Sequence, residues 1–373
     1  MKYLFIVQGE GRGHLTQAIA LEEILRSSGH EVVEVLVGKS SSRQLPAFFS
    51  RSIHAPIHRF ESPNFLPTAS NKRNNITRSV AYNVARLPVY LRSMHFIKEH
   101  IARSGADMVV NFYELLTGLA YALYRIPTPQ VCIGHQYLFL HHDFRFPKKS
   151  LPGLWGLKFF TRLTCIGAKK KLALSFHAMD EDVKEDIRVV PPLLRKEVFR
   201  CECSEGDYVH GYMVNSGFAE SVREWHALHP DVPLRFFWDK RGEKTVRRED
   251  DTLSFYPLND VEFLRQMSGC RAYASTAGFE SICEAMYLCK PVLMVPAHIE
   301  QDCNAFDAAS NGAGIVSDSF ELDRLLAFAE QYVPDVRFRT WVESAPYMIC
   351  YALDPDAYKH QASDHMYMVE EFT

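Results

Sequence analysis

The chain has 373 residues, of which 47% are hydrophobic and 23% are charged. This is an ordinary globular composition at about twice the common domain size of ~100–200 residues, so two domains are expected. The net charge of -3 argues against a nucleic-acid partner, because no chain-wide basic field would attract a polyanion. Nine cysteines scattered over a chain of this size favour reduced thiols, and therefore a cytoplasmic protein, over a disulfide framework.

Short apolar runs alternate with amphipathic stretches, a pattern typical of a parallel sheet with crossover helices, and the predicted fold class is α/β. The apolar run over 3–7 is too short for a signal-peptide core and is interpreted as a buried first strand. No run reaches the ~18 apolar residues of a membrane-spanning helix. In the first half we expect strands over 3–7, 31–37, 107–112 and 130–134, and helices over 15–28, 76–103 and 115–125.

The second half repeats this alternation of strands and helices. The expected strands are 208–214, 234–238, 253–256, 272–275 and 291–295, and the expected helices are 218–229, 260–268, 279–288 and 302–311. Each of these helices follows a strand, so the second half also predicts a doubly wound sheet.

Two successive prolines, Pro191 and Pro192, separate the halves, stop any helix and hold the backbone extended. We therefore expect four parts: an amino-terminal lobe over 1–190, a linker over 191–205, a carboxy-terminal lobe over 206–335 and a tail over 336–373. Packing of the tail on the first lobe is one arrangement open to it. Ligands of such sheets bind beyond the carboxyl ends of the strands, so two facing lobes would enclose a cleft.

A glycine-rich turn, Gly9-Glu10-Gly11-Arg12-Gly13-His14, follows the first strand and opens a helix. Backbone N–H groups at such a place can face an anion or a polar substrate. The dinucleotide fingerprint would require a third glycine where His14 stands, which argues against a nicotinamide or flavin enzyme. A histidine at this place can take a proton from an acceptor hydroxyl near neutral pH. The alternative, a histidine that only fills the turn, is equally compatible with the motif.

The second half carries a longer constellation of polar residues. Gly278 admits close backbone approach, and Ser281 lies in the first turn of a helix whose free N–H groups suit a diphosphate. Glu284 follows one turn later, where a carboxylate can accept two hydrogen bonds from a ribose diol. Gln301 and Asn304 lie three apart on the next helix and can face sugar hydroxyls together. The alternative for each residue alone is a surface helix or a polar loop.

The order and spacing of these segments resemble the donor-binding half of inverting glycosyltransferases with the GT-B fold. The nearest likenesses are the UDP-glycosyltransferase superfamily and the transferases related to the bacterial enzyme that adds GlcNAc to lipid I. The resemblance implies that His14 is the catalytic base and that the leaving group is displaced directly, with inversion and without a metal or a cofactor. It implies nucleotide-sugar contacts from Gly11, Gly13, Ser216, Gly217, Tyr256, Thr276, Gly278, Ser281, Glu284, Gln301 and Asn304.

The sequence departs from this family pattern in two places. Many UDP-glycosyltransferases carry His-Gly-Gly where this chain has Ser275-Thr276-Ala277-Gly278, which leaves the nucleotide identity open. No aspartate partner for His14 is evident, and Glu114, at the end of a predicted strand, is the candidate. Two groups of potential metal ligands are not interpreted as metal sites. Asp180-Glu181-Asp182 is interpreted as a solvated turn, and the pair Cys201 and Cys203 lacks the second ligand pair of a structural zinc site.

The segment over 145–171 combines seven lysines and arginines after Arg145 with many aromatic and aliphatic residues. Such a stretch can lie on an anionic membrane surface, so peripheral contact with the inner face of the membrane and a lipid-linked sugar acceptor are expected from this interpretation. A buried helix with solvated lysines is the alternative, and the lack of a long, clean amphipathic period favours it. His135, His141 and His142, near the end of a predicted strand, are candidates for acceptor contacts.

Two other functions remain open at this point. A UDP-GlcNAc 2-epimerase-like enzyme would share the lobes and the nucleotide site but would need further acidic residues in the cleft. A non-catalytic nucleotide-sugar-binding accessory subunit would need no base at all.

Overall fold

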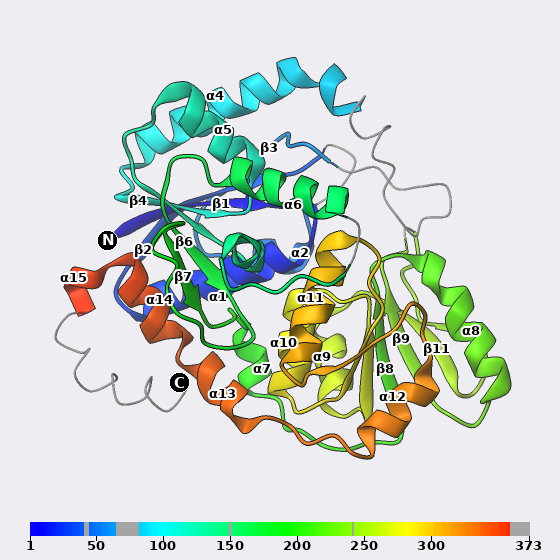
Figure 1. Ribbon diagram of the computed structural model, residues 1–373. Helices are drawn as coiled ribbons and strands as arrows, with labels where there is room; N and C mark the ends of the chain where they lie inside the picture. The colour runs from blue at the N-terminus through cyan, green and yellow to red at the C-terminus, as the bar shows by residue number, and fades with distance from the viewer. Residues whose placement is uncertain (41–44, 65–81, 149–150, 241, 359–373) are drawn as a thin grey trace.

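The computed structural model describes residues 1–40, 45–64, 82–148, 151–240 and 242–358. Two lobes lie side by side, each built on a seven-stranded sheet with helices on both faces (Figure 1). The first lobe occupies the upper half of the view, and the second lobe, which begins near residue 209, lies below and to its right.

The first sheet is entirely parallel, with strand order β3-β2-β1-β4-β5-β6-β7. Its strands are β1 (Lys2–Gln8), β2 (Glu31–Gly38), β3 (Ile57–Phe60), β4 (Met108–Phe112), β5 (Gln130–Ile133), β6 (Ala168–Leu174) and β7 (Ile187–Val190). Its helices are α1 (Gly13–Ser27), α2 (Ala47–Ser52), α4 (Leu87–Ser104), α5 (Leu115–Tyr124), the 3-10 helix η1 (His135–Leu140) and α6 (Leu151–Thr164).

The second sheet has strand order β10-β11-β9-β8-β12-β13-β14 and is parallel except for the β10–β11 pair. Its strands are β8 (Val209–Met213), β9 (Leu234–Trp238), β10 (Arg247–Arg248), β11 (Leu253–Pro257), β12 (Ala272–Ser275), β13 (Val292–Met294) and β14 (Gly314–Val316). Its helices are the 3-10 helix η2 (Ser216–Phe218), α8 (Ala219–Leu228), α9 (Asp260–Ser268), α10 (Phe279–Tyr287), α11 (Ile299–Ser310) and α12 (Leu322–Ala329).

Strand β1 shows how the sequence builds the core. Its side chains alternate between the two faces of the sheet, as in any strand. Tyr3, Phe5 and Val7 belong to one buried cluster that reaches into the second lobe, whereas Leu4 and Ile6 belong to a separate cluster under α4 and α5. Because both faces are covered, the strand is a continuous apolar run, as expected for a central strand of a parallel sheet.

The nine strands predicted from the sequence are all present, with ends shifted by one residue at most. Helix 76–103 is described from residue 82 on, and its main part is α4; residues 76–81 lie outside the described residues. The short strands β3, β7, β10 and β14 were not predicted. Strand β6 was not predicted either, because Lys169, Lys170 and Lys171 conceal it within the basic segment.

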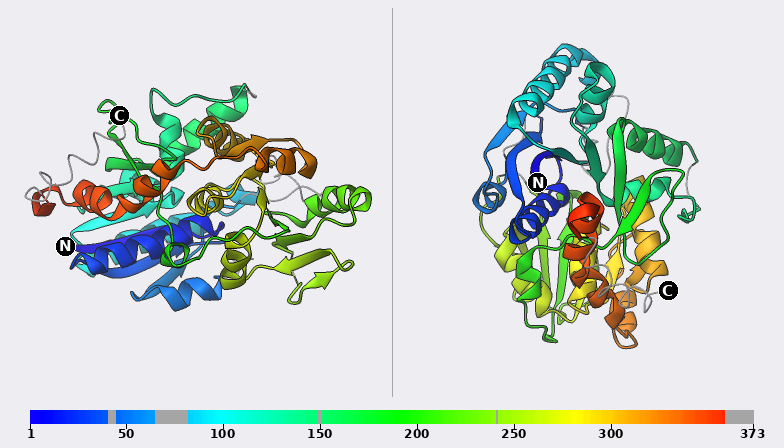
Figure 2. Two further views of the ribbon diagram at one scale, coloured as in Figure 1. Left: turned by 90° about the horizontal axis from the view of Figure 1, so that it is seen from below. Right: turned by 90° about the vertical axis from the view of Figure 1, so that its left-hand side faces the viewer.

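The chain crosses between the lobes twice. After β7 it runs through Pro191 and Pro192 to the short helix α7 (Lys196–Phe199) and on to β8. After α12 it returns to the first lobe through α13 (Val336–Glu343), α14 (Ala345–Leu353) and α15 (Pro355–Tyr358). Helix α14 lies beside α1, as the right-hand view of Figure 2 shows. The indole Nε1 of Trp341 donates to the carbonyl of Ser175, at 2.9 Å, and anchors this return. Residues 359–373 of the predicted tail lie outside the described residues.

Among the described helices, none combines the length and the apolar character that a bilayer crossing requires.

Candidate active site

The glycine-rich turn joins β1 to α1 at the seam between the lobes. Gly9 donates its backbone N–H to the carbonyl of Gly38, at 2.7 Å, which closes the turn against β2. Arg12 forms an ion pair with Asp260 of the second lobe, at 2.6 Å between Nη2 and Oδ1. Helix α1 begins at Gly13, so His14 and Gln17 lie on one face of its first turns. The turn therefore faces the second lobe, as the sequence motif requires.

His14 is buried at this seam. Its Nδ1 lies 3.0 Å from Oε1 of Gln17, and its ring stacks on Tyr113 with centroids 5.6 Å apart. Burial lowers the pKa of His14, against the hydrogen bond with Gln17 and the charge of Glu300, which raise it. The imidazole is therefore neutral at physiological pH, which is the form that can accept a proton.

Glu280 of the second lobe completes this cluster. The Gln17 amide donates to its carboxylate through Nε2, and a Cβ atom at Gly13 would overlap the same carboxylate. Burial, together with the charges of Glu300 and Glu284, raises the pKa of Glu280 to about 7, although the hydrogen bond from Gln17 lowers it. Glu280 and Gln17 were not predicted as site residues; the signal available was the position of Glu280 directly before Ser281 on the donor-side helix.

Glu114, the predicted carboxylate partner of His14, is engaged elsewhere. It accepts from Ser62 Oγ, at 2.7 Å, and from the backbone N–H of Leu116, at 3.1 Å, and it caps the start of α5. Burial raises the pKa of Glu114 to about 7, although these hydrogen bonds lower it. The hydrogen bond of His14 that the structure shows goes to Gln17 instead, so the partner comes from the same helix as the histidine.

The turn between β12 and α10 holds three of the predicted donor-side residues. Ala277 has a positive φ of 55°, and Gly278 is the N-cap of α10. The Ser281 hydroxyl donates to the Gly278 carbonyl, at 3.1 Å. Thr276 is fully buried, and its Oγ1 accepts from the backbone N–H of Val214, at 3.0 Å. Thr276 thus joins this turn to the end of β8, just before Ser216 and Gly217 in η2.

Glu284 lies one turn along α10, buried, and forms a bidentate ion pair with Arg195 of the linker. Its Oε1 is 2.6 Å from Nε of Arg195 and its Oε2 is 3.0 Å from Nη2. The Nη1 atom of Arg195 also lies 3.9 Å from Oδ1 of Asp260. The carboxylate predicted to bind ribose therefore binds a guanidinium from the linker, a contact that no sequence pattern indicated.

Gln301 and Asn304 are both buried on α11 beside the same turn. Oε1 of Gln301 accepts from the backbone N–H of Ala297, at 2.9 Å. Nδ2 of Asn304 donates to the carbonyl of Ala277, at 3.2 Å. The buried Oδ1 of Asn304 has no hydrogen-bond donor among the described residues. This oxygen can accept from a ligand hydroxyl.

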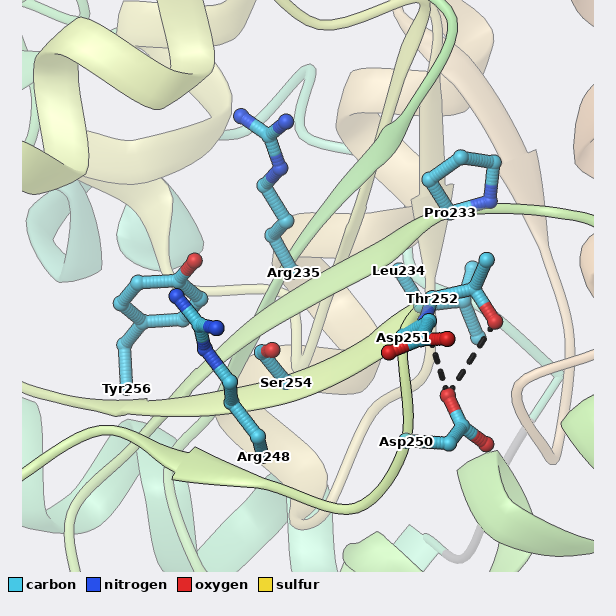
Figure 3. A pocket seen from close by; sticks show the side chains of 9 residues that line it. All are labelled: Pro233, Leu234, Arg235, Arg248, Asp250, Asp251, Thr252, Ser254 and Tyr256. Carbon is cyan, nitrogen blue, oxygen red and sulfur yellow. Dashed lines mark hydrogen bonds between the residues drawn. The ribbon is translucent and has the colours of Figure 1, made fainter.

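Tyr256 lies apart from this turn, on the β9–β11 side of the second sheet. Its ring stacks on Phe237 with centroids 5.1 Å apart. It also lines a polar hollow over β9, β10 and β11, shown in Figure 3. The other residues of this hollow are Pro233, Leu234, Arg235, Arg248, Asp250, Asp251, Thr252 and Ser254. Most of them lie near the amino ends of β9 and β11, away from the edge that faces the cleft, so we do not assign the donor site to it.

The three histidines near the end of β5 differ in their surroundings. His135 is buried and stacks on Phe279 of α10, with centroids 4.0 Å apart, so it joins the lobes. Nε2 of His141 lies 2.9 Å from the Asp180 carbonyl, and Nδ1 of His142 lies 2.9 Å from Asp182. Asp182 is therefore part of a histidine cluster rather than a solvated turn, and it is itself buried.

The predicted basic segment forms α6 and β6. Leu151, Trp155 and Phe159 follow one face of α6 and are 70%, 75% and 64% exposed, which defines an apolar stripe on the surface. Several of the basic side chains are paired: Arg162 with Glu185 and Lys170 with Glu181. Lys149 lies outside the described residues. The surface of this segment is thus more apolar and less basic than its sequence suggests.

Several solved structures of known proteins share this two-lobed architecture. Among solved structures, Phytolacca americana UGT2 complexed with UDP-2fluoro-glucose and pterostilbene has a TM-score of 0.60 at 13% identity, over 92% of this chain and 94% of that chain. CalG4, the calicheamicin glycosyltransferase, has a TM-score of 0.59 at 13% identity, over 95% of this chain and 97% of that chain. Arabidopsis thaliana UGT89C1 complexed with UDP has a TM-score of 0.59 at 16% identity, over 92% of this chain and 94% of that chain. No curated protein matches the sequence.

The two mostly parallel seven-stranded sheets and these neighbours define a GT-B fold, the architecture of a large class of glycosyltransferases. The sequence model described as glycosyl transferase family 1 matches residues 1–333. The chain belongs to this family and is a glycosyltransferase.

Proposed function

We propose that the protein transfers a sugar from a UDP-sugar to an acceptor hydroxyl, with inversion and without a metal ion. The observation that carries this proposal is the buried neutral imidazole of His14 at the seam between the lobes, facing the helix that bears Ser281 and Glu284. The solved Phytolacca and Arabidopsis enzymes named above hold UDP or a UDP-sugar, which supports uridine as the nucleoside of the donor.

In the proposed reaction, Nε2 of His14 takes the proton of the acceptor hydroxyl while the oxygen of that hydroxyl attacks the anomeric carbon of the donor sugar. The bond from that carbon to the diphosphate oxygen breaks, and the electron pair leaves with the diphosphate. Attack from the face opposite the leaving group inverts the anomeric configuration. Free N–H groups in the first turn of α10 stabilise the departing charge.

The donor sugar would be held by the groups around this turn. Oδ1 of Asn304 accepts from a sugar hydroxyl, since no described residue donates to it. Glu284 binds the ribose diol through lone pairs that Arg195 leaves available, so donor affinity depends on how the ion pair adjusts. These contacts orient the sugar for in-line attack and make no bond themselves.

A thermal-shift screen tests the donor assignment, because a bound ligand stabilises the folded state by mass action. We expect a rise in melting temperature with UDP and UDP-sugars and none with NAD. A rise with other nucleoside diphosphates only would replace the uridine assignment, and a rise with NAD would overturn the glycosyl-donor site.

The apolar stripe of Leu151, Trp155 and Phe159 supports a finer proposal about the acceptor. Gly153 of α6 is next to Ile299 of α11, and it lies about 200° around the helix from Leu151 and from Trp155, so the stripe is on the face of α6 turned away from that contact. Exposed apolar side chains of this size gathered on one helix face mark a surface that contacts another apolar body. We assign this body to the membrane, where Lys158, which directly precedes Phe159 on α6, favours anionic lipid, and the acceptor to a lipid-linked sugar or glycolipid.

Co-sedimentation with vesicles tests this proposal. Wild-type protein should bind vesicles of phosphatidylcholine and phosphatidylglycerol, and the triple variant Leu151→Ser, Trp155→Ser, Phe159→Ser should not. Leu228→Ser, at an exposed leucine on α8, is the matched control. Binding by the triple variant at the wild-type level would overturn the assignment. Concentration-dependent dimerisation that the triple variant abolishes would identify a second copy of the chain as the occupant instead.

One observation also favours the epimerase-like alternative. That reaction needs acidic groups in the cleft, and Glu280 lies there with a pKa near 7. Incubation of the protein with UDP-GlcNAc alone, followed by NMR of the products, separates the two functions. Formation of UDP-ManNAc would establish the epimerase. UDP-GlcNAc that stays unchanged on its own but is consumed when an acceptor is added supports the transferase.

A further inference from the structure

Three side chains from two lobes form a chain of hydrogen bonds that begins at His14. Nδ1 of His14 faces Oε1 of Gln17, and Nε2 of Gln17 donates to the carboxylate of Glu280. His14 and Gln17 belong to α1 of the first lobe, and Glu280 belongs to α10 of the second lobe. Both Gln17 and His14 are buried, so water has little access to replace these partners.

The chemistry of the three groups fixes the direction of this chain. An ionised carboxylate only accepts hydrogen bonds, so it takes the NH2 end of the Gln17 amide. The carbonyl end of the same amide must then face His14, and a carbonyl only accepts. Nδ1 of His14 is therefore the donor and carries the proton, which leaves the lone pair on Nε2.

We propose that Glu280, acting through Gln17, holds His14 in the Nδ1-protonated tautomer, so that a basic Nε2 is present only when the second lobe is seated against the first. This inference rests on the proposed role of His14 as the base. Glu280 and Gln17 are positioning residues: the amide between them cannot carry a proton onward, so the pair orients the imidazole and does not share its charge.

Other charged groups surround this chain and set its pH dependence. The charge of Glu300 of α11 raises the pKa of both His14 and Glu280. Glu300 also accepts a hydrogen bond from Nε2 of Gln136, at 3.0 Å. Glu284 acts on Glu280 from the same helix and is paired with Arg195. A protonated Glu280 could donate to the amide oxygen, and the amide would then turn its NH2 toward His14. Protonation of Glu280 therefore releases the tautomer.

The decisive measurement is the tautomer of His14, read from the ring 15N shifts of histidine-labelled protein at pH 8, with His14→Gln to assign the signals. Wild-type protein should show the Nδ1-protonated form. Glu280→Leu, which removes the acceptor of the Gln17 NH2, should shift the population toward the Nε2-protonated form and lower kcat by about 10- to 100-fold, the usual effect of losing an orienting partner, with the donor KM little changed.

Two further variants separate orientation from a general structural effect. Gln17→Glu combined with Glu280→Gln moves the carboxylate next to Nδ1 and should restore both the tautomer and most of the turnover. Asp307→Asn, which removes another buried carboxyl of the second lobe, should change neither.

The outcomes distinguish this inference from the proposed function. A His14 tautomer that is the same in wild type and Glu280→Leu, or a double variant that has neither the wild-type tautomer nor most of the turnover, would overturn the role of Glu280. Unchanged turnover in His14→Ala would overturn the proposed base, whatever tautomer the ring adopts.

Discussion

Arg195 and Glu284 bind each other through two hydrogen bonds, of 2.6 Å and 3.0 Å, and so join the interlobe linker to the donor-side helix α10. Their side chains are 15% and 4% exposed, so both charges have left most of their water. Removal of one partner strands the other charge in a buried place, which is far more costly than the loss of a surface ion pair.

Arg195→Ala should therefore lower the free energy of unfolding by about 3–5 kcal/mol. Urea unfolding at neutral pH measures the change. Lys196→Ala, which breaks a surface ion pair with Glu23, is the neighbouring control and should cost less than ~1 kcal/mol. Equal losses in the two variants would show that the Arg195 pair is not effectively buried.

Glu284→Ala should weaken UDP binding as well as stability. The double variant Arg195→Ala, Glu284→Ala should recover part of the stability, because no unpaired charge remains, but none of the UDP affinity. Calorimetric titration with UDP measures the affinity. Full UDP affinity in Glu284→Ala would remove this residue from the donor site.

His14→Ala should lower turnover by about 10²–10⁴-fold, the contribution of a general base, while UDP binding survives. Steady-state assays with a UDP-sugar and an acceptor give turnover, and calorimetry gives the affinity. His14→Gln, which keeps a polar side chain at the site but has no basic nitrogen, should lose turnover equally, and retention of activity there would contradict the base assignment.

Gly13→Ala and Gly11→Ala form a matched pair within one turn. A Cβ at Gly13 overlaps the Glu280 carboxylate, whereas no atom lies within 4 Å of one at Gly11. Gly13→Ala should therefore lower the melting temperature and disturb the His14 tautomer, and Gly11→Ala should leave both near wild type. Differential scanning calorimetry compares them, and indistinguishable variants would show that Glu280 moves aside freely.

Stability should fall as pH rises from about 4 to about 7 through the contribution of the buried carboxyls. Burial raises the pKa of Glu114, Glu280 and Asp307 to about 7 each, so the folded state binds protons that the unfolded state has released. This stabilisation is complete below the unfolded pKa and is lost as pH rises through 7, at up to ~1.4 kcal/mol per pH unit and carboxyl.

The difference between wild type and Glu114→Gln isolates one such group. The free energy of unfolding of the variant, relative to that of wild type, should be higher at pH 8 than at pH 5, as measured by urea unfolding at both values. A difference that is independent of pH would show that Glu114 titrates normally in the folded protein.

The sequence predicted the central strands and the helix after Gly278 because both depend on local patterns. Strand β9 is a short, mostly apolar run, and the 279–288 segment has the period of an amphipathic helix. The donor contacts of Gly278, Ser281 and Glu284 follow from the family resemblance and stay predictions. Strand β6 was missed because lysine side chains can extend from a strand to solvent while its backbone pairs with β5 and β7.

The partners of the site residues could not be predicted in the same way. Arg195 reaches Glu284 across 89 positions, and Gln17 reaches Glu280 across 263. No local pattern reports a contact between two lobes, since it depends on how the finished lobes meet. The same holds for Glu114: its position at the end of β4 was predicted correctly, but its side chain turns to Ser62 and the start of α5.

The return of α13 and α14 to the first lobe has a mechanical consequence. Because the chain joins the lobes both before β8 and after α12, and Trp341 fixes the second crossing to Ser175, the second lobe is held at two places along one side. A body held at two points can swing about the line through them but cannot twist freely or drift away. We therefore expect substrate to enter and product to leave by a hinge-like motion of the second lobe, with the Gln17–Glu280 contact formed in the closed position.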